Sequence, residues 1–117
     1  MQQSTYRNAA RTLLTQGVEE LAEGDVRQAS EKGWGAAAQI VKAVASRRGW
    51  RHNGHAALFA VIDRLVTETG NDGLRRRFHV ADSLHQNFYE DWQSAEAVGS
   101  GLADVGRLID ELEPLLA

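Results

Sequence analysis

The amino-acid sequence predicts an all-α protein, an antiparallel up-and-down bundle of four to five helices. Its single proline, Pro114, lies almost at the end of the chain, and β-branched residues never gather into the alternating runs typical of strands. Apolar residues instead recur three and four positions apart in several segments. The loops between these segments are short, which favours antiparallel neighbours. A length of 117 residues fits one domain, so we expect a single helical domain over residues 1–117.

The first predicted helix covers residues 4–22. Its apolar stripe consists of residues at helical spacing, namely Leu13, Leu14, Val18 and Leu21. Gly24 and Asp25 follow this helix directly. Glycine is the usual residue after a helix end and aspartate is a favoured N-cap, so we expect the first helix to stop here and the second to begin.

The second predicted helix, residues 26–47, is unusually rich in small side chains. Ala29, Gly33 and Ala37 stand four positions apart, and Gly35 is a second glycine inside the helix. Each internal glycine costs about 1 kcal/mol relative to alanine. Such a cost is tolerated where small residues let another backbone approach, so we expect this helix to be the central one, closely crossed by a neighbour.

Three further helices are expected along the rest of the chain. Asn53 is a suitable cap for a helix over residues 54–69, and a Gly-Asn-Asp-Gly loop separates it from a helix over residues 74–92. Ser94 then caps a last helix over residues 95–113, whose apolar residues share one face while its acidic residues share the other.

The helix over residues 74–92 contains the stretch LHQNFYEDW, in which polar and aromatic residues are dense. At about 100° per residue, the face that carries His85 is otherwise apolar, and we expect it to be core. This face comprises Leu74, Phe78, Ala81, Leu84, Phe88 and Trp92. Tyr89 lies at its edge and Asn87 on its flank. His85 is therefore either a buried, hydrogen-bonded histidine or a ligand-facing one in a cleft between helices.

Charge is unevenly distributed along the chain, whose net charge is −3. Residues 46–79 hold seven arginines and three acidic residues, a net charge of +4. Residues 80–117 hold one arginine and eight acidic residues, a net charge of −7. A basic middle and an acidic end indicate either an anionic ligand or two complementary faces that meet, for example in a dimer.

Two arginine clusters lie in the basic middle. The first, interleaved with Trp50, comprises Arg47, Arg48, Arg51, His52 and His55. It can hold a phosphate or stack on a base, or simply place cations at a helix C-terminus, where the dipole favours them. The second comprises Arg75, Arg76 and Arg77. Cations are unfavourable at a helix start, so we expect this cluster to pair with the acidic last helix, with a second subunit or with an anion.

Several kinds of site are not expected. The chain has no cysteine, which excludes disulfides and thiolate metal sites. His52 and His55 have no carboxylate at a fitting spacing, so we predict no metal site and no cofactor. The sequence has no apolar run long enough to span a membrane and no signal-peptide core, so we expect a cytoplasmic protein without a membrane partner.

Three stretches, EGDVRQASEKGWGAAAQIVKAVASRRGW, HNGHAALFAVIDRL and ADSLHQNFYEDW, follow one another in an order that resembles the PaREP1-like family, a branch of the HEPN superfamily. The resemblance covers about residues 20–92. It implies an all-α, HEPN-like bundle that commonly forms a homodimer. HEPN members include metal-independent ribonucleases, nucleotide-binding proteins and partners of minimal nucleotidyltransferases in toxin–antitoxin pairs.

The ribonuclease members of that superfamily carry an Arg-x(4–6)-His motif on a late helix. In this sequence the matching positions hold His85 and Glu90, and a carboxylate there would repel the scissile phosphate. Two pairs with a fitting spacing lie instead in the loop after the second helix, Arg47 with His52 and Arg48 with His55. The resemblance therefore implies no catalytic residue at the position that the ribonucleases use.

A polar cleft between the second and fourth helices is the expected ligand site. It comprises Arg27, Glu31, Lys32 and Trp34 on the second helix and His85, Asn87 and Tyr89 on the fourth. Arg27 and Glu31, four residues apart, can equally form a surface ion pair. We predict a non-catalytic module that binds a nucleotide, a nucleic acid or a partner protein. The alternatives are a diverged ribonuclease that uses an arginine with His52, His55 or His85, and a purely structural interaction domain.

Overall fold

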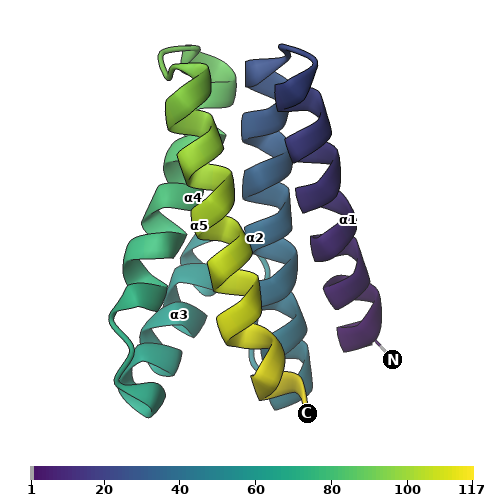
Figure 1. Ribbon diagram of the computed structural model, residues 1–117. Helices are drawn as coiled ribbons and strands as arrows, with labels where there is room; N and C mark the ends of the chain where they lie inside the picture. Colours follow the sequence, from purple (N-terminus) through teal and green to yellow (C-terminus); the bar gives the residue numbers. More distant parts are fainter. Residues whose placement is uncertain (1) are drawn as a thin grey trace.

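The computed structural model describes residues 2–117, and within them the chain is helical, with no strand (Figure 1). The elements are α1 (Gln2–Ala22), α2 (Val26–Arg48), α3 (His55–Thr69), α4 (Gly73–Glu90), α5 (Ala95–Leu112) and a short 3₁₀ turn, η1 (Glu113–Leu116). The predicted all-α bundle is confirmed. None of these helices combines the length and the apolar composition that crossing a membrane requires.

Helix α2 is the centre of the bundle, with α1 on one side and α4 and α5 on the other (Figure 1). Its small residues make this position possible, and the fully buried ones include Ala29, Ala36, Ala37, Ala43 and Ala45. A Cβ atom added to Gly33 would lie 2.8 Å from side-chain carbons of Leu84 on α4 and of Leu102 on α5. The prediction of a central helix that its neighbours cross closely is confirmed.

Helix α1 packs against α2 through a face that includes Leu13 and Gly17, and its Leu21 lies beside Gly99 of α5. A Cβ atom added to Gly17 would lie 3.2 Å from the Cβ of Lys32 on α2, so the two helices approach closely here. The expectation that Val18 belongs to this face is wrong, because the residue is 53% exposed. Val18 follows the contacting glycine directly and therefore points about 100° away from the line of contact.

Two of the three predicted helix caps are present. The Asp25 carboxylate and the Ser94 hydroxyl each accept a hydrogen bond from the backbone N–H three residues further on, at 3.1 and 3.0 Å. Asn53, in contrast, does not cap α3. The N-cap residue is Gly54, whose φ of 89° lies in the left-handed region, and no side chain bonds to the first turn. The start of α3 is therefore open.

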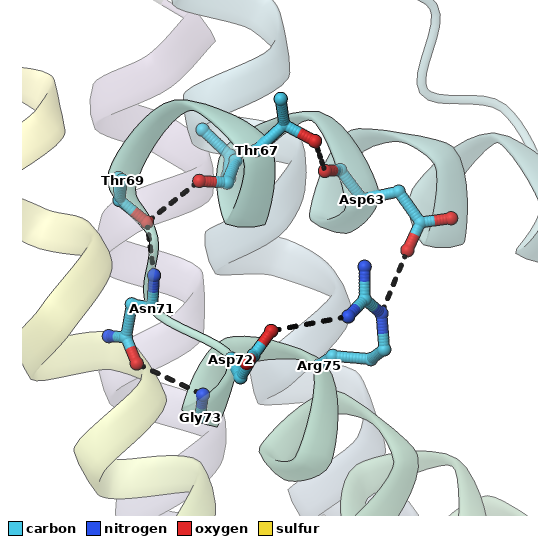
Figure 2. Close-up of polar contacts among 8 residues, drawn as sticks. Asp63, Thr67, Thr69, Asn71, Asp72, Gly73 and Arg75 are labelled. Atoms are coloured by element: carbon cyan, nitrogen blue, oxygen red, sulfur yellow. Dashed lines mark hydrogen bonds and ion pairs between the residues drawn. The ribbon is translucent and has the colours of Figure 1, made fainter.

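The turn between α3 and α4 is held by its own side chains (Figure 2). The side-chain oxygen of Asn71 accepts a hydrogen bond from the Gly73 N–H at 3.0 Å. Arg75, in the first turn of α4, donates to Asp63 on α3 at 3.1 Å and lies 3.5 Å from Asp72. An arginine at a helix start is unfavourable by itself, and these two carboxylates offset that cost.

Helix α4 ends earlier than its apolar pattern suggests, at Glu90 rather than at residue 92. Asp91 adopts the left-handed conformation, with a φ of 53°, and turns the chain out of the helix. Leu84 is fully buried as expected, but Trp92 is 63% exposed, and the prediction that it is core is wrong. A helical wheel places a residue correctly only for as long as the helix continues.

Candidate functional site

Among the residues expected to line a cleft between α2 and α4, two half-buried side chains form a short contact. His85 Nδ1 on α4 lies 2.7 Å from Glu31 Oε1 on α2, and the two side chains are 23% and 31% exposed. The Tyr89 ring stands edge-on to the imidazole, with 5.4 Å between ring centres, and is largely exposed. His85 is thus bonded within the bundle and still partly open to solvent, which combines the two alternatives drawn for it.

His55, the first residue of α3, joins this contact although the sequence groups it with the arginine-rich loop. Its ring stacks on Trp34, with 4.6 Å between centres and 14° between planes. Its ring centre lies 5.2 Å from that of His85, and its Nε2 lies 3.5 Å from Asp82 Oδ1. Two imidazoles, each beside a carboxylate, therefore lie next to one indole. We call this group the histidine cluster: Glu31, Trp34, His55, Asp82 and His85.

Asp82 is the member of the histidine cluster that sequence reasoning missed. It stands three residues before His85, which places both on one side of α4, and that spacing was the available signal. His55 could not be placed in this way, because its position depends on the loop between α2 and α3. That loop returns along the bundle, so the start of α3 lies beside Trp34, well before the end of α2.

Asn87 lies inside the protein rather than in the expected cleft. The residue is fully buried. Its Nδ2 donates to Ser30 Oγ at 2.7 Å, and its Oδ1 accepts hydrogen bonds from the backbone N–H groups of Trp92 at 2.8 Å and Gln93 at 2.7 Å. This buried amide ties α2 to the turn after α4, which the position of Asn87 on a helical wheel does not reveal.

Arg27 and Lys32 pair with neighbours outside the histidine cluster. Lys32 Nζ lies 2.8 Å from Glu20 Oε1 on α1. Arg27 donates through Nε and Nη2 to the carbonyl oxygen of Phe88, at 2.9 and 2.7 Å. These contacts also replace the alternative ion pair between Arg27 and Glu31. Of the residues expected in the cleft, those that meet are Glu31, Trp34, His85 and Tyr89.

The first arginine cluster contributes to a pocket beside α3. The pocket has a volume of about 480 Å³ and lies between the loop before α3 and the outer side of that helix. Its lining residues with functional side chains are Trp50, Arg51, Asn53, His55 and Arg64, and no lining residue is acidic. The pocket shares His55 with the histidine cluster, so the two sites adjoin one another.

Two arginines stack on Trp50, which lines this pocket. The guanidinium carbon of Arg64 lies 3.9 Å from the centre of the indole ring and that of Arg48 lies 5.2 Å from it. Arg48 also donates to both carboxylate oxygens of Glu68, at 2.7 and 2.9 Å. These hydrogen bonds raise the pKa of Arg48 and lower the pKa of Glu68. Sequence reasoning assigned Arg64 to no site, because only the packing of α3 beside the loop brings it to Trp50.

Of the remaining members of the first cluster, two form contacts within the protein and one is exposed without an ion pair to the residues described. Arg47 donates to the carbonyl oxygen of Ala117, at 3.2 Å. His52 Nδ1 lies 2.9 Å from the carbonyl oxygen of Trp50, and its ring contacts Tyr6 edge-on. Arg51 is exposed and forms no ion pair with any residue in the range 2–117. Arg51 is therefore the member of the cluster that stays open to a ligand.

The second arginine cluster is mostly paired within the chain. Besides Arg75, Arg77 lies 2.8 Å from Glu111 on the acidic helix α5, one of the pairings that the charge pattern suggests. Arg76 is exposed. In the described part of the chain, no group of three or more histidine, aspartate or glutamate side chains is arranged to hold a metal ion.

Comparison with known proteins places the chain in a family. The model of the archaeal PaREP1/PaREP8 family matches residues 5–109. No curated protein matches the sequence significantly. A crystal structure of a protein from Sulfolobus solfataricus is similar in fold, with a TM-score of 0.83 and 21% sequence identity, over 93% of this chain and 97% of that chain. Because the family match spans most of the sequence, the protein belongs to the archaeal PaREP1/PaREP8 family.

Proposed function

We propose that this protein is a binding module for a nucleotide or a single-stranded nucleic acid, with the pocket beside α3 as its site. The observation that carries the proposal is the composition of that pocket. One aromatic ring, two arginines and the open start of a helix surround a space of about 480 Å³, a volume suited to a small ligand. Nucleotides combine a flat base with an anionic phosphate, and these wall groups match both parts.

In this proposal the phosphate lies at the first turn of α3. Gly54 leaves the N–H groups of that turn without a side-chain cap. Such groups bind anions, and the helix dipole adds to the attraction. Arg51 lines the same pocket, and no acidic lining residue neutralises its charge. A phosphate would thus meet backbone donors and a guanidinium together.

The base lies beside Trp50 and Arg64 in the same proposal. The Arg64 guanidinium already lies over the Trp50 ring, 3.9 Å from the ring centre. A base would therefore stack on the outer face of that guanidinium or take its place on the indole. Stacking on an aromatic side chain contributes roughly 1–3 kcal/mol per base and tolerates any base, because every base has a π-face. We therefore expect little preference among base sequences.

The resemblance to the HEPN superfamily supports a nucleotide- or RNA-associated role, and three expectations drawn from the sequence accompany it. The protein would be a HEPN-like homodimer, it would act in the cytoplasm, and a minimal nucleotidyltransferase would be a fitting protein partner. Sedimentation velocity checks the first of these, and a monomer at micromolar concentration contradicts it. A neighbouring gene for a nucleotidyltransferase would support the third.

Binding is tested with a fluorescein-labelled single-stranded RNA of about ten nucleotides, within the usual range of site sizes, and with ATP as competitor. Fluorescence anisotropy is recorded at low and at high salt. We expect the affinity for RNA to fall steeply as salt rises, because phosphate contacts release counterions. Absence of binding to both ligands at low salt would contradict the proposal.

Charge variants locate the site. Arg51→Ala and Arg64→Ala are each expected to weaken binding about tenfold or more, because each removes a charged partner of the ligand. Arg107→Ala is the matched control, since Arg107 is an exposed arginine on α5 and lines no part of the pocket. An equal loss of affinity in all three variants would show that only net charge matters.

A second candidate function, metal-independent cleavage of RNA, is favoured by the histidine cluster. His55 and His85 adjoin one another, and each lies beside a carboxylate that can orient its ring. His55 also lines the proposed phosphate site. A neutral imidazole can accept the proton of an attacking 2′-hydroxyl, while a protonated one donates a proton to the leaving 5′-oxygen. The nucleophile and the leaving group both belong to the RNA.

Cleavage is measured on a labelled RNA in the presence of a chelator. His55→Ala and His85→Ala are expected to abolish it while leaving RNA binding measurable by anisotropy. His52→Ala is the control, because His52 contacts Tyr6 and the backbone of the loop rather than the cluster. Cleavage that persists in all three variants would remove this candidate and leave the binding module standing.

A further inference from the structure

The last turn of α4 and the turn that follows it each present one aromatic side chain to solvent. Tyr89 is 67% exposed and Trp92 is 63% exposed. Apart from Val18 on α1, no other large apolar side chain in residues 2–117 is exposed. Tyrosine and tryptophan, together with arginine, dominate the binding energy of protein interfaces. Two such residues three positions apart, outside the core, therefore need an explanation.

The backbone that carries these rings is held firmly. Asn87, fully buried, accepts hydrogen bonds from the N–H groups of Trp92 and Gln93. Gln93 in turn donates to the carbonyl oxygen of Ser83, at 3.1 Å. The Asp91 N–H donates to the carbonyl oxygen of Asn87, at 2.8 Å. The exposure of Trp92 is thus a property of a fixed turn. Side chains on a fixed backbone lose less entropy when a partner binds.

Carboxylates are frequent at the same end of the bundle as the two rings. The end of α4, the turn after it and the first turn of α5 contribute Glu90, Asp91 and Glu96, which are exposed and form no ion pair with residues 2–117. The turn between α1 and α2 lies at the same end of the bundle (Figure 1) and adds Glu23 and Asp25, which are also without an ion pair in that range. We call this region the acidic aromatic end: Glu23, Asp25, Tyr89, Glu90, Asp91, Trp92 and Glu96.

We propose that the acidic aromatic end docks an arginine-bearing segment of a partner protein. A guanidinium stacks on an aromatic face and pairs with a carboxylate through two parallel hydrogen bonds, whereas a lysine ammonium does neither as well. The stacking of a guanidinium on an aromatic ring also occurs within this protein. Arg27 lies over the Phe88 ring at 5.3 Å and Arg64 over the Trp50 ring at 3.9 Å. Arg27 itself lies at the acidic aromatic end but is already bonded to the carbonyl oxygen of Phe88. The arginine that would stack on Tyr89 and Trp92 is to be supplied by the partner.

Charge argues against two other occupants. A nucleic acid would bring phosphates against five carboxylates, which Arg27 in the first turn of α2 offsets only in part. The nucleotide pocket and this surface therefore attract opposite kinds of ligand. A second copy that docks through the same surface around a two-fold axis would place like charges opposite one another. The docking surface shares no residue with the pocket beside α3, and the inference does not rest on the proposed function.

The test compares an oligo-arginine peptide with an oligo-lysine peptide of equal length, each fluorescein-labelled, by anisotropy at physiological salt. We expect the arginine peptide to bind more tightly. The double variant Tyr89→Ala/Trp92→Ala keeps every carboxylate and is expected to weaken arginine binding at least about tenfold while changing lysine binding little. Val18→Ala is the matched control, because it removes an exposed apolar side chain from α1 and is expected to leave both affinities unchanged.

Two outcomes would overturn the inference. Equal binding of both peptides that the double variant leaves unchanged would mean that the surface attracts any cation without docking arginine. Self-association of the wild-type protein in sedimentation velocity, lost in the double variant, would identify a second copy as the occupant instead. Circular dichroism and thermal melting confirm folding of the double variant, which is expected because both replaced side chains are mostly in solvent.

Discussion

Two tryptophans of this protein follow a helix end in the same way and finish in opposite surroundings. Trp50 comes directly after Gly49, which ends α2 with a φ of 70°, and Trp92 directly after Asp91, which ends α4 with a φ of 53°. Trp50 is half-buried beneath two arginines. Trp92 is 63% exposed and follows two acidic residues. The backbone geometry is alike, so the difference arises from what packs against each turn.

The connection that follows each tryptophan explains the contrast. After Trp50 the chain continues through residues 51–54 before α3 starts, and that loop returns along the bundle, so Arg64 of α3 reaches the indole. After Trp92 the chain passes through residues 93 and 94 and enters α5 at once. No helix can return over the ring within so short a turn. The longer connection therefore builds a pocket wall, and the shorter one leaves the ring outside.

The largest expected effect comes from the residue that supports the turn of Trp92. Asn87→Ala removes three hydrogen bonds of a buried amide and leaves the partner groups unsatisfied, so we expect it to lower the free energy of unfolding by about 3 kcal/mol. Asn53→Ala is the control in the other connection, because Asn53 is exposed and caps no helix. Urea denaturation measures both, and similar losses would refute the contrast between the two connections.

The tryptophans themselves are expected to differ next. Trp50→Ala removes a half-buried ring and its contacts with two arginines, and we expect a loss of about 2 kcal/mol in the free energy of unfolding. Trp92→Ala should change stability by less than about 0.5 kcal/mol, since its ring is mostly in solvent. Thermal and urea unfolding of the two single variants decide this, and a larger loss for Trp92→Ala than for Trp50→Ala would contradict the contrast between the two rings.

The residues before the tryptophans give a smaller effect of opposite sign. Asp91 occupies a left-handed conformation that costs a non-glycine residue roughly 1 kcal/mol, so Asp91→Gly is expected to stabilise the protein by up to that amount. Gly49→Ala introduces the same cost and should destabilise by about 1 kcal/mol. A comparison of urea midpoints tests the pair, and a shift in the same direction for both variants contradicts the shared geometry.

The smallest expected effect is a pH dependence in the region of Trp50. Hydrogen bonds from Arg48 hold the pKa of Glu68 below its usual value. A lowered pKa in the folded state means that the ion pair stabilises the protein above the unfolded-state pKa, and that this contribution is lost as the pH falls through the folded-state pKa. Both side chains are partly in solvent, so the contribution is small and screened by salt.

Unfolding by urea between pH 6 and pH 3 measures this contribution. Glu68→Gln is expected to reduce the loss of stability over that range, and high salt should remove the difference between the variant and the wild type. A pH dependence that the variant leaves unchanged would show that this ion pair makes no contribution.

The signals that predicted the fold correctly are local ones. Asp25 and Ser94 mark helix starts because their side chains bond to backbone groups three residues away. Gly33 indicates a close crossing because a glycine destabilises the interior of a helix. That cost is offset where the missing side chain lets a neighbouring helix approach. Each of these inferences needs only a few neighbouring residues, and each is confirmed.

The candidate site could be predicted only in part, for a related reason. Glu31, Trp34 and His85 were assigned to one cleft because the family resemblance is strongest on the segments of α2 and α4 that carry them, and these side chains do meet. His55 was assigned to the arginine-rich loop and not to this cleft, and Arg64 was assigned to no site, because the positions of both depend on how α3 packs. Asn87 was wrongly assigned to the cleft. A helical wheel gives the direction in which a side chain points, but it does not show whether a buried hydrogen-bond partner such as Ser30 lies in that direction.

The sequence by itself determined the helices, the caps of α2 and α5, the central position of α2 and the separation of positive from negative charge. These properties follow from hydrogen bonds between residues a few positions apart and from apolar periodicity, both of which depend on residues close together in the sequence. Only the tertiary structure decided that one tryptophan is covered by arginines and the other exposed among carboxylates. It also decided that His55 adjoins His85. Such contacts join residues far apart in sequence, and they form only when the connections between helices set which surfaces meet.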